Sequence, residues 1–211
     1  RLRDLTAHDL VFCVLSGGAA ALMTMPAEGI SLEDLQATTQ LLLQAGAPID
    51  QVNTVRKHLD LIKGGGLANM AGEAALISLV LSDVVGDDLS VIASGPTAPD
   101  RSTFADAWLV IDYYGLIDQL PHSVRTRLQA GLDGKIADTP KPGDPLFAND
   151  QIVIVASNRL AAEAAESLAK KLNFNTLLLS TFVQGEAREV AKVAAALAKE
   201  IIASDRPMVR P

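Results

Sequence analysis

Apolar residues along the chain fall into short continuous runs, and longer stretches with helical spacing separate these runs. The runs lie at 9–15, 75–83, 89–93, 151–156 and 176–180. Near-continuous apolarity, in place of strict alternation, is typical of parallel strands that are covered on both faces. We therefore expect all five runs to be buried strands, and we expect the first four to share one sheet.

The stretches between these runs carry helical patterns. Residues 31–46 open with Ser31 as a helix cap, have Asp34 three residues later, and end at Gly46. Further helical patterns lie at 103–114, 121–130, 158–172 and 185–204. The alternation predicts an α/β fold with a mostly parallel, Rossmann-like sheet in three layers, with helices on both faces.

Composition supports a folded domain. The chain has 211 residues, of which 49% are apolar and 20% charged, so it can form a substantial core as one large domain or two small ones. Residues 134–150 hold three prolines and two glycines, which predicts a long loop or linker. Cys13, the single cysteine, lies in an apolar run and is expected to be a small buried residue.

The net charge of -7 argues against nucleic acid or an anionic membrane as the main partner, whereas small anionic ligands need only a local positive site. Apolar runs all fall short of the ~18 residues that a membrane helix needs. We expect a cytoplasmic protein that acts on small molecules. The oligomeric state stays open, a homodimer included.

Small polar or acidic residues follow four of the predicted strands, where ligands bind in open parallel sheets. They are Ser16-Gly17-Gly18, Ser82-Asp83 with Gly86-Asp87-Asp88, Ser94-Gly95-Pro96-Thr97, and Ser157-Asn158. Ordinary turn chemistry would explain any one of them alone. Because four such ends occur together, we expect Ser16, Asp83, Ser94 and Ser157 to line a common edge of the sheet.

The turn at Ser16-Gly17-Gly18 joins a predicted strand to a predicted helix. Its glycines would let backbone N–H groups approach an anion, and the following helix N-terminus would favour negative charge. The turn does not fit the dinucleotide or Walker patterns, and Val14 stands where a hydrolase nucleophile elbow needs glycine. The sequence therefore favours an anion-binding turn without naming its ligand.

A locally basic segment covers residues 53–68. If it is helical through Lys63, then Asn53, Arg56 and Lys63 lie within an arc of about 80°. Arginine and lysine suit carboxylate or phosphate, although a solvated helix face is the alternative. Three glycines follow, at 64–66, which favours close backbone approach or a hinge. We expect Arg56→Ala and Lys63→Ala to lower kcat/KM and to leave stability nearly unchanged.

Three carboxylates, Asp83, Asp87 and Asp88, come just after a predicted strand. Mg²⁺ prefers oxygen ligands and is often held by one or two carboxylates with substrate phosphates, which makes Asp83 and Asp87 candidate metal ligands. A carboxylate here could instead act as a base or cap the next element. The three histidines are scattered, without the spacing of metal ligands.

Several long motifs resemble the glycerate 2-kinase family, whose members are also known as the MOFRL family or as hydroxypyruvate reductases. They are "SGGAAALMTMPAEGISLEDLQATTQLLLQAGAPIDQVNTVRKHLDLIKGGGLA", "LSDVVGDDLSVIASGPTAPDRSTFADA", "DTPKPGDP" and "GEAREVA". The resemblance covers nearly the whole chain. It departs in one place, because the family usually has Ser-Gly-Gly-Gly-Ser where this chain has Ser16-Gly17-Gly18-Ala19-Ala20.

The resemblance implies transfer of the ATP γ-phosphoryl group to the 2-hydroxyl of D-glycerate, giving 2-phosphoglycerate, with Mg²⁺ as cofactor. It also implies that residues 1–211 are most of the N-terminal α/β domain of a two-domain enzyme and are inactive alone. The family carries an upstream glycine-rich segment with an essential lysine and a glycine-rich C-terminal domain, and we expect both to lie outside this chain.

Residue types at the matching positions suit that chemistry. Arg56, Lys63 and Asp83 are expected to be catalytic, with Asp83 and Asp87 as metal ligands. The expected substrate and phosphate contacts are Ser16, Gly17, Gly18, Asn53, Gly64, Gly65, Ser94, Gly95, Thr97, Ser157 and Asn158. Two alternatives stay open: an NAD(P)H-dependent hydroxypyruvate reductase, for which a dinucleotide fingerprint is missing, and a non-catalytic domain that binds a sugar acid or phosphate.

Overall fold

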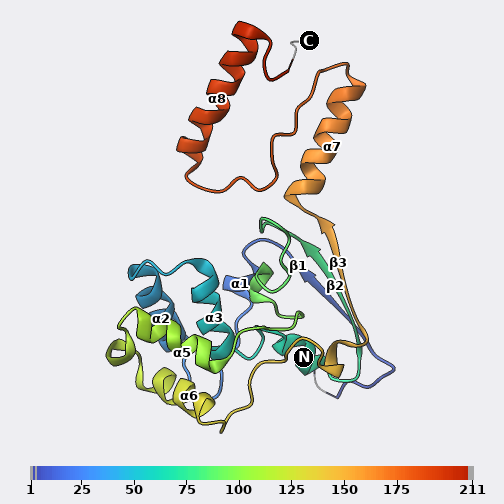
Figure 1. The fold of residues 1–211 in the computed structure, drawn as a ribbon. Helices are drawn as coiled ribbons and strands as arrows, with labels where there is room; N and C mark the ends of the chain where they lie inside the picture. The colour runs from blue at the N-terminus through green and yellow to red at the C-terminus, as the bar shows by residue number, and fades with distance from the viewer. Residues whose placement is uncertain (1, 3, 209–211) are drawn as a thin grey trace. The chain divides into compact units, whose positions relative to one another are not determined.

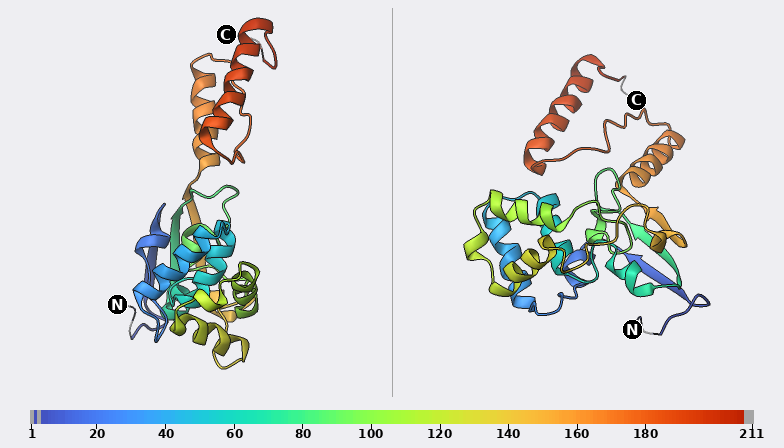
Figure 2. Two further views of the ribbon diagram at one scale, coloured as in Figure 1. Left: turned by 90° about the vertical axis from the view of Figure 1, so that its left-hand side faces the viewer. Right: turned by 60° about the horizontal axis from the view of Figure 1, so that its bottom comes forward.

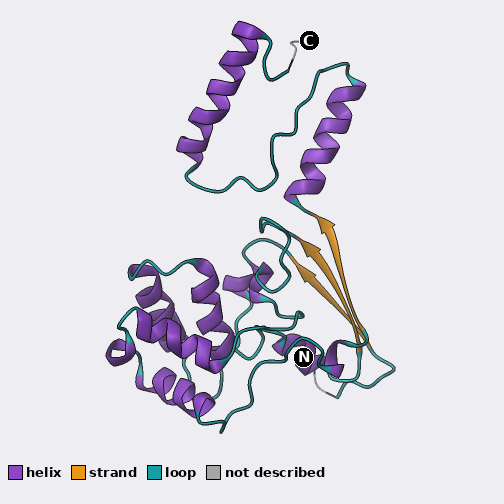
Figure 3. Cartoon of the chain, in the orientation of Figure 1, coloured by secondary structure: helices purple, strands orange, loops and turns teal. Residues whose placement is uncertain are grey.

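A computed structural model describes residues 2 and 4–208, which include one three-stranded sheet (Figures 1 and 3). The strands are β1 (Leu10–Leu15), β2 (Ala75–Leu81) and β3 (Asp150–Ala156), in the order β1-β2-β3. β1 and β2 are parallel, with Leu10 opposite Ala75 and Leu15 opposite Val80. All three arrows point the same way in Figure 3. The predicted α/β fold with a parallel sheet is confirmed.

Two of the five predicted strands are wrong. Residues 89–93 form a turn that leads into the short 3₁₀ helix η1 (Ile92–Ser94). Ala93, Ser94 and Gly95 have φ values of 53°, 63° and 62°, which no extended strand adopts. Ile92 is nevertheless buried, so the apolar run packs without pairing. Residues 176–180 carry no strand, and their leucines are exposed.

The described helices include one at each of the five helical patterns listed above, with bounds that differ by at most two residues, and several further ones. They are α1 (Ala19–Leu22), α2 (Leu32–Gln44), α3 (Ile49–Leu59), α4 (Gly66–Ala71), α5 (Phe104–Tyr113), α6 (His122–Leu132), α7 (Asn158–Lys171) and α8 (Ala187–Ser204), with two further 3₁₀ helices, η2 (Ile117–Gln119) and η3 (Pro145–Phe147). Ser31 and Asp34 form the capping box that the sequence approaches, since each side chain bonds the other's backbone N–H. Among the described residues, every helix is too short or too polar to cross a lipid bilayer.

Helix α3 ends at Leu59, so the predicted helix through Lys63 is wrong. Asp60 is extended, with φ -131° and ψ 128°, and forms an antiparallel bridge with Pro26. The N–H of Leu61 donates to the carbonyl of Met25 at 2.7 Å, next to this bridge. Pairing with a distant segment thus replaces the next helical turn.

The chain divides into two compact units. The first unit is Arg1–Val80 with Leu89–Ile154, and the second is Leu81–Asp88 with Val155–Pro211. In the first unit, α2, α3, α5 and α6 pack against one another in one bundle (Figures 1 and 2). Its core contains Leu35, Leu42, Val52, Val55, Leu59, Phe104, Ile111, Val124 and Leu128.

Strand β1 shows how the sheet joins this unit. Cys13 and Leu15 are buried, as expected for the lone cysteine, whereas Leu10, Phe12 and Val14 on the opposite face are exposed. Side chains alternate between the two faces of a strand. One face of β1 therefore packs into the first unit, while the other presents apolar side chains to solvent.

Candidate functional site

The exposed turn at Ser16–Gly18 leads directly into α1. Gly18 has φ 81°, a left-handed conformation that glycine adopts easily, and the N–H of Ala19 donates to the Ser16 carbonyl at 3.2 Å. Helix α1 packs against η1, which carries Ser94. The buried Ser94 hydroxyl donates to Asn53 Oδ1 on α3 at 3.0 Å. Three segments of the first unit therefore lie next to one another here: the turn with α1, η1, and α3.

Arg56 projects from α3 toward the same place. Its Nη2 donates to the carbonyl of Ala20 at 2.7 Å, while its Nε is buried without a hydrogen-bond partner. Burial lowers the pKa of Arg56, and the nearby Asp60 carboxylate opposes this shift. A guanidinium stays protonated in proteins. Arg56 is therefore a half-buried cation whose Nε has no hydrogen-bond partner within the protein.

Lys63 lies in a different setting from Arg56, because its side chain is fully buried. Its Nζ donates to Asp60 Oδ2 at 2.9 Å, to the Met23 carbonyl at 2.8 Å and to Thr24 Oγ1 at 3.2 Å. Burial lowers the pKa of Lys63, whereas Asp60 raises it. These three acceptors match the three protons of the ammonium group. Through these bonds Lys63 holds the segment that follows α1, at Met23 and Thr24, in place.

The glycines after Lys63 do make the predicted close backbone approach, and the group they approach is another loop of the protein. Gly64 and Gly65 donate their N–H groups to the carbonyls of Ser94 and Gly95, at 3.0 and 2.7 Å. A Cβ added at Gly65 would meet Phe147 at 3.0 Å. The triplet therefore fixes the loop at 94–95 beside α3.

Thr97, another predicted contact, is held inside the first unit. It is buried, and its Oγ1 accepts a hydrogen bond from Ser78 of β2 at 2.8 Å. The hydroxyl pair ties the segment after η1 to the sheet. Thr97 thereby helps to position the loop that contains Ser94 and Gly95.

The remaining predicted residues lie in the second unit. Asp87 and Asn158 line one small cavity, and the amide of Asn158 donates to the Thr181 carbonyl at 3.5 Å. Ser157 caps α7 by accepting the N–H of Leu160 at 3.3 Å. Asp83 is exposed. Ser16 and Ser94 belong to the first unit and Asp83 and Ser157 to the second, so their common edge stays a prediction.

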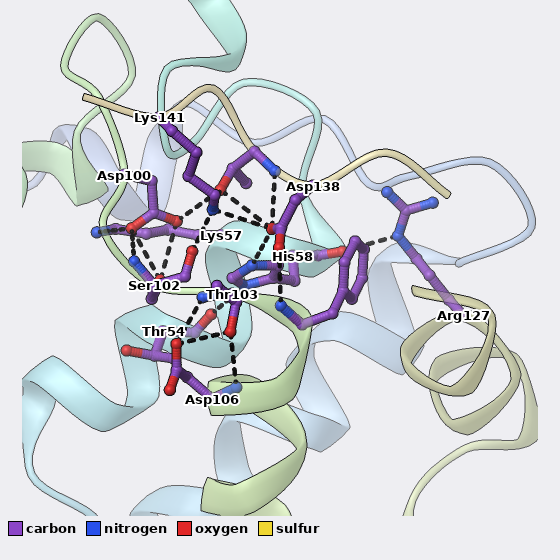
Figure 4. A network of polar contacts seen from close by, with 12 residues as sticks. Thr54, Lys57, His58, Asp100, Ser102, Thr103, Asp106, Arg127, Asp138 and Lys141 are labelled. Atoms are coloured by element: carbon purple, nitrogen blue, oxygen red, sulfur yellow. Dashed lines mark hydrogen bonds and ion pairs between the residues drawn. The ribbon is translucent and has the colours of Figure 1, made fainter. Parts of the chain in front are cut away.

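Sequence reasoning missed a charged network around α3 (Figure 4). Lys57 Nζ donates to Asp100 Oδ1 at 3.1 Å in a buried ion pair. The same carboxylate accepts from the hydroxyls of Ser102 and Thr139, at 2.8 and 3.0 Å. Burial raises the pKa of Asp100, but Lys57 and the bonds from Ser102 outweigh it and hold this pKa below its usual value.

The other half of this network anchors the proline-rich loop, which the sequence predicted only as a loop or linker. His58 is buried between the Thr54 carbonyl, at 2.8 Å, and Asp138, at 3.0 Å. Lys141 donates to Asp138 at 3.1 Å and also to the Ser102 carbonyl. The sequence signal that could have predicted this anchoring is the presence of Asp138, Thr139 and Lys141 among the prolines of the loop.

Comparisons with known proteins agree with this fold. The profile of a domain of unknown function (DUF4147) matches residues 1–129. A crystal structure of a glycerate kinase from Thermotoga maritima superposes with a TM-score of 0.85 at 40% identity, over 99% of this chain and 47% of that one. A protein from Pyrococcus horikoshii OT3 superposes with a TM-score of 0.82 at 41% identity, over 100% and 47%. The fold is that of the glycerate kinase structures.

Curated relatives carry the comparison further. A glycerate 2-kinase from Pyrococcus horikoshii is 42% identical over 204 residues, which cover 97% of this chain and 46% of the relative. A putative hydroxypyruvate reductase from Agrobacterium vitis is 41% identical over 210 residues, or 100% of this chain and 46% of the relative. The chain belongs to the glycerate 2-kinase family and spans about half the length of these relatives.

Proposed function

We propose that the full-length protein transfers the γ-phosphoryl group of ATP to the 2-hydroxyl of D-glycerate, giving 2-phosphoglycerate. The observation that carries this proposal is about 40% identity, across nearly the whole chain, to proteins named glycerate 2-kinase and D-glycerate 2-kinase. In this proposal residues 1–211 are most of the N-terminal domain of a two-domain cytoplasmic enzyme, and the chain alone is inactive.

Phosphoryl transfer depends mostly on positioning and on neutralising phosphate charge. We assign the neutralising role in the first unit to Arg56, whose Nε has no protein partner. The exposed turn at Ser16-Gly17-Gly18 supplies backbone N–H groups next to it. Asn53 and Ser94, which bond each other, orient the surrounding loops. Lys63 acts by holding the segment after the turn, because its ammonium protons are taken by protein acceptors.

Mg²⁺ and ATP belong to this proposal as cofactor and co-substrate. The donor set after β2 is compatible with Mg²⁺, since one or two carboxylates suffice when substrate phosphates complete the shell. Asp83 and Asp87 would hold the ion, with Ser157 and Asn158 nearby in the same unit as phosphate contacts. Within the described residues no group of three or more His, Cys, Asp or Glu side chains gathers. When bound, the ion would neutralise charge on the transferred phosphoryl group.

The test is to incubate the purified full-length protein with D-glycerate, ATP and Mg²⁺ and to follow products by ³¹P NMR. We expect a 2-phosphoglycerate signal that requires all three components. Oxidation of NADH with hydroxypyruvate, without any phosphoglycerate, would contradict the proposal.

The same experiment decides the second candidate, a hydroxypyruvate reductase. The name of the Agrobacterium vitis relative favours it. The absence of a dinucleotide-binding fingerprint in the sequence speaks against it. A third reading, a non-catalytic domain that binds a sugar acid or phosphate, predicts ligand binding with no turnover of either substrate pair.

A further inference from the structure

A surface cavity of about 480 Å³ opens beside Arg56, between the end of α1, the outer face of α2 and α3. Its lining includes Thr24, Leu32, Gln36, Gln40, Leu43 and Arg56. This volume lies within the range of ~300–1,000 Å³ that small-molecule sites occupy. The cavity belongs wholly to the first unit.

One end of the cavity is cationic. Arg56 gives one guanidinium nitrogen to the Ala20 carbonyl and keeps its buried Nε without a partner. A buried donor that is left unpaired costs roughly 1–3 kcal/mol. Arg56 lines the cavity, and its positive charge would pair with an anionic group of a ligand. Thr24, on the same wall, accepts a hydrogen bond from the Lys63 ammonium at 3.2 Å, and Asp60 balances the charge of Lys63, so Arg56 supplies the net positive charge at this end. This end suits phosphate or carboxylate.

The wall formed by α2 has a different character. Leu32 and Leu43 are 47% and 56% exposed and both line the cavity, so they give this wall an apolar surface. Gln36 and Gln40 lie between them at helical spacing on the same face, and both are exposed. Each amide offers a donor beside an acceptor, the pattern that the N6 and N7 edge of adenine complements. A small hydroxy acid has no apolar surface to cover two leucines, whereas a purine base has two flat faces.

We propose that this cavity binds a nucleoside triphosphate. Its base lies over Leu32 and Leu43 against the amides of Gln36 and Gln40, and its phosphates point to Arg56. This inference rests on the proposed function for the choice of a nucleotide as ligand, and it assigns the nucleotide to the first unit of this chain.

The test measures binding of the non-hydrolysable analogue AMP-PNP with Mg²⁺ to the full-length protein by calorimetry. The double variant Gln36→Leu/Gln40→Leu is expected to weaken binding by about tenfold, the scale of one or two lost hydrogen bonds. Gln44→Leu is the matched control, because Gln44 is exposed on the same helix and does not line the cavity. It should bind as the wild type does, and equal melting temperatures should verify folding.

Inorganic tripolyphosphate separates the two ends of the cavity. Arg56→Ala should weaken both AMP-PNP and tripolyphosphate, whereas the glutamine double variant should weaken only AMP-PNP. Unchanged AMP-PNP affinity in the double variant would overturn the inference. If the glutamine double variant had a raised KM for D-glycerate and an unchanged KM for ATP, the inference would also be overturned, because the cavity would then hold the hydroxy acid.

Binding is measured without turnover, so the two proposals fail separately. A protein that binds AMP-PNP through Gln36 and Gln40 but forms no phosphoglycerate would contradict the proposed function and support the nucleotide site. A protein that forms phosphoglycerate with the glutamine variants at wild-type KM for ATP would contradict only the site.

Discussion

The helices of the two units have similar amphipathic patterns and very different surroundings. In the first unit, α2, α3, α5 and α6 bury side chains such as Leu42, Val55 and Leu128 completely. In the second unit, α7 and α8 bury no side chain, and Leu168 and Val193 are 59% and 63% exposed. An amphipathic pattern thus indicates that a helix has a face to cover. It does not indicate whether the covering partner lies within the same unit.

Charged pairs also differ between the two units, and replacing one member of a pair gives the largest expected effect on the free energy of unfolding. Lys63 and Asp60 are fully buried, whereas Lys192 and Glu189 of α8 pair at 2.7 Å with both side chains exposed. Lys63→Met leaves a buried carboxylate unpaired and should cost about 3–5 kcal/mol in the free energy of unfolding. Lys192→Met should cost less than ~1 kcal/mol. Urea denaturation of the full-length protein measures both.

This prediction replaces the sequence-based expectation that Lys63 serves anion binding and leaves stability unchanged. Losses of equal, small size in the two variants would mean that the buried pair contributes no more than the exposed one. Lys63→Arg does not serve as a control, since the larger guanidinium has no room among the three acceptors of a fully buried site.

Apolar truncations test the comparison directly. Leu42→Ala removes a fully buried side chain from the helical core and should cost about 2–5 kcal/mol. Leu168→Ala removes an exposed one from α7 and should change the free energy of unfolding by less than ~0.5 kcal/mol. Parallel urea titrations of both variants give the two values. A loss at Leu168 as large as that at Leu42 would show that α7 is covered in the full-length protein.

Arg56 should affect catalysis with little effect on stability. Arg56→Ala removes a half-buried cation whose Nε has no protein partner, and kcat/KM should fall by tenfold or more, about 1.4 kcal/mol. Arg188→Ala, an exposed arginine of α8, is the control and should leave kcat/KM unchanged. Steady-state kinetics with D-glycerate and ATP give the result. Equal kinetics in both variants would remove Arg56 from the site.

The smallest effect concerns pH and the loop that Asp138 anchors. Burial raises the pKa of Asp138, but the bonds from Lys141 and the Thr139 N–H outweigh it and lower this pKa. A carboxylate with a lowered folded pKa stabilises the protein fully above its unfolded pKa, about 3.9. That contribution is lost as the pH falls through the lower, folded pKa. The side chain is 33% exposed, so we expect less than ~1 kcal/mol.

Unfolding free energies of wild type and Asp138→Asn, measured from pH 6 down to pH 2.5, check this sign. The wild type should be the more stable at pH 6, and the difference should shrink as the pH falls. A difference that stays constant over the whole range would mean that Asp138 acts through packing and not through its charge.

Local patterns were sufficient for most of the secondary structure. Ser31 with Asp34 marked the start of α2, and the apolar runs at 9–15, 75–83 and 151–156 became β1, β2 and β3 within two residues. These signals arise within a few residues, through capping bonds and side-chain periodicity, so the sequence displays them directly. The family resemblance, carried by long motifs, was equally readable from the sequence.

Long-range contacts decided the rest. No residue between Asp60 and Lys63 is a helix breaker, yet the bridge of Asp60 with Pro26 and the bond from the Met25 N–H, 35 residues away, ended α3 at Leu59. The same packing buried Lys63 among protein acceptors and left Arg56 Nε without one. Two cations that look equivalent in the sequence therefore differ in role, because burial and the choice of partner depend on segments that only folding brings together.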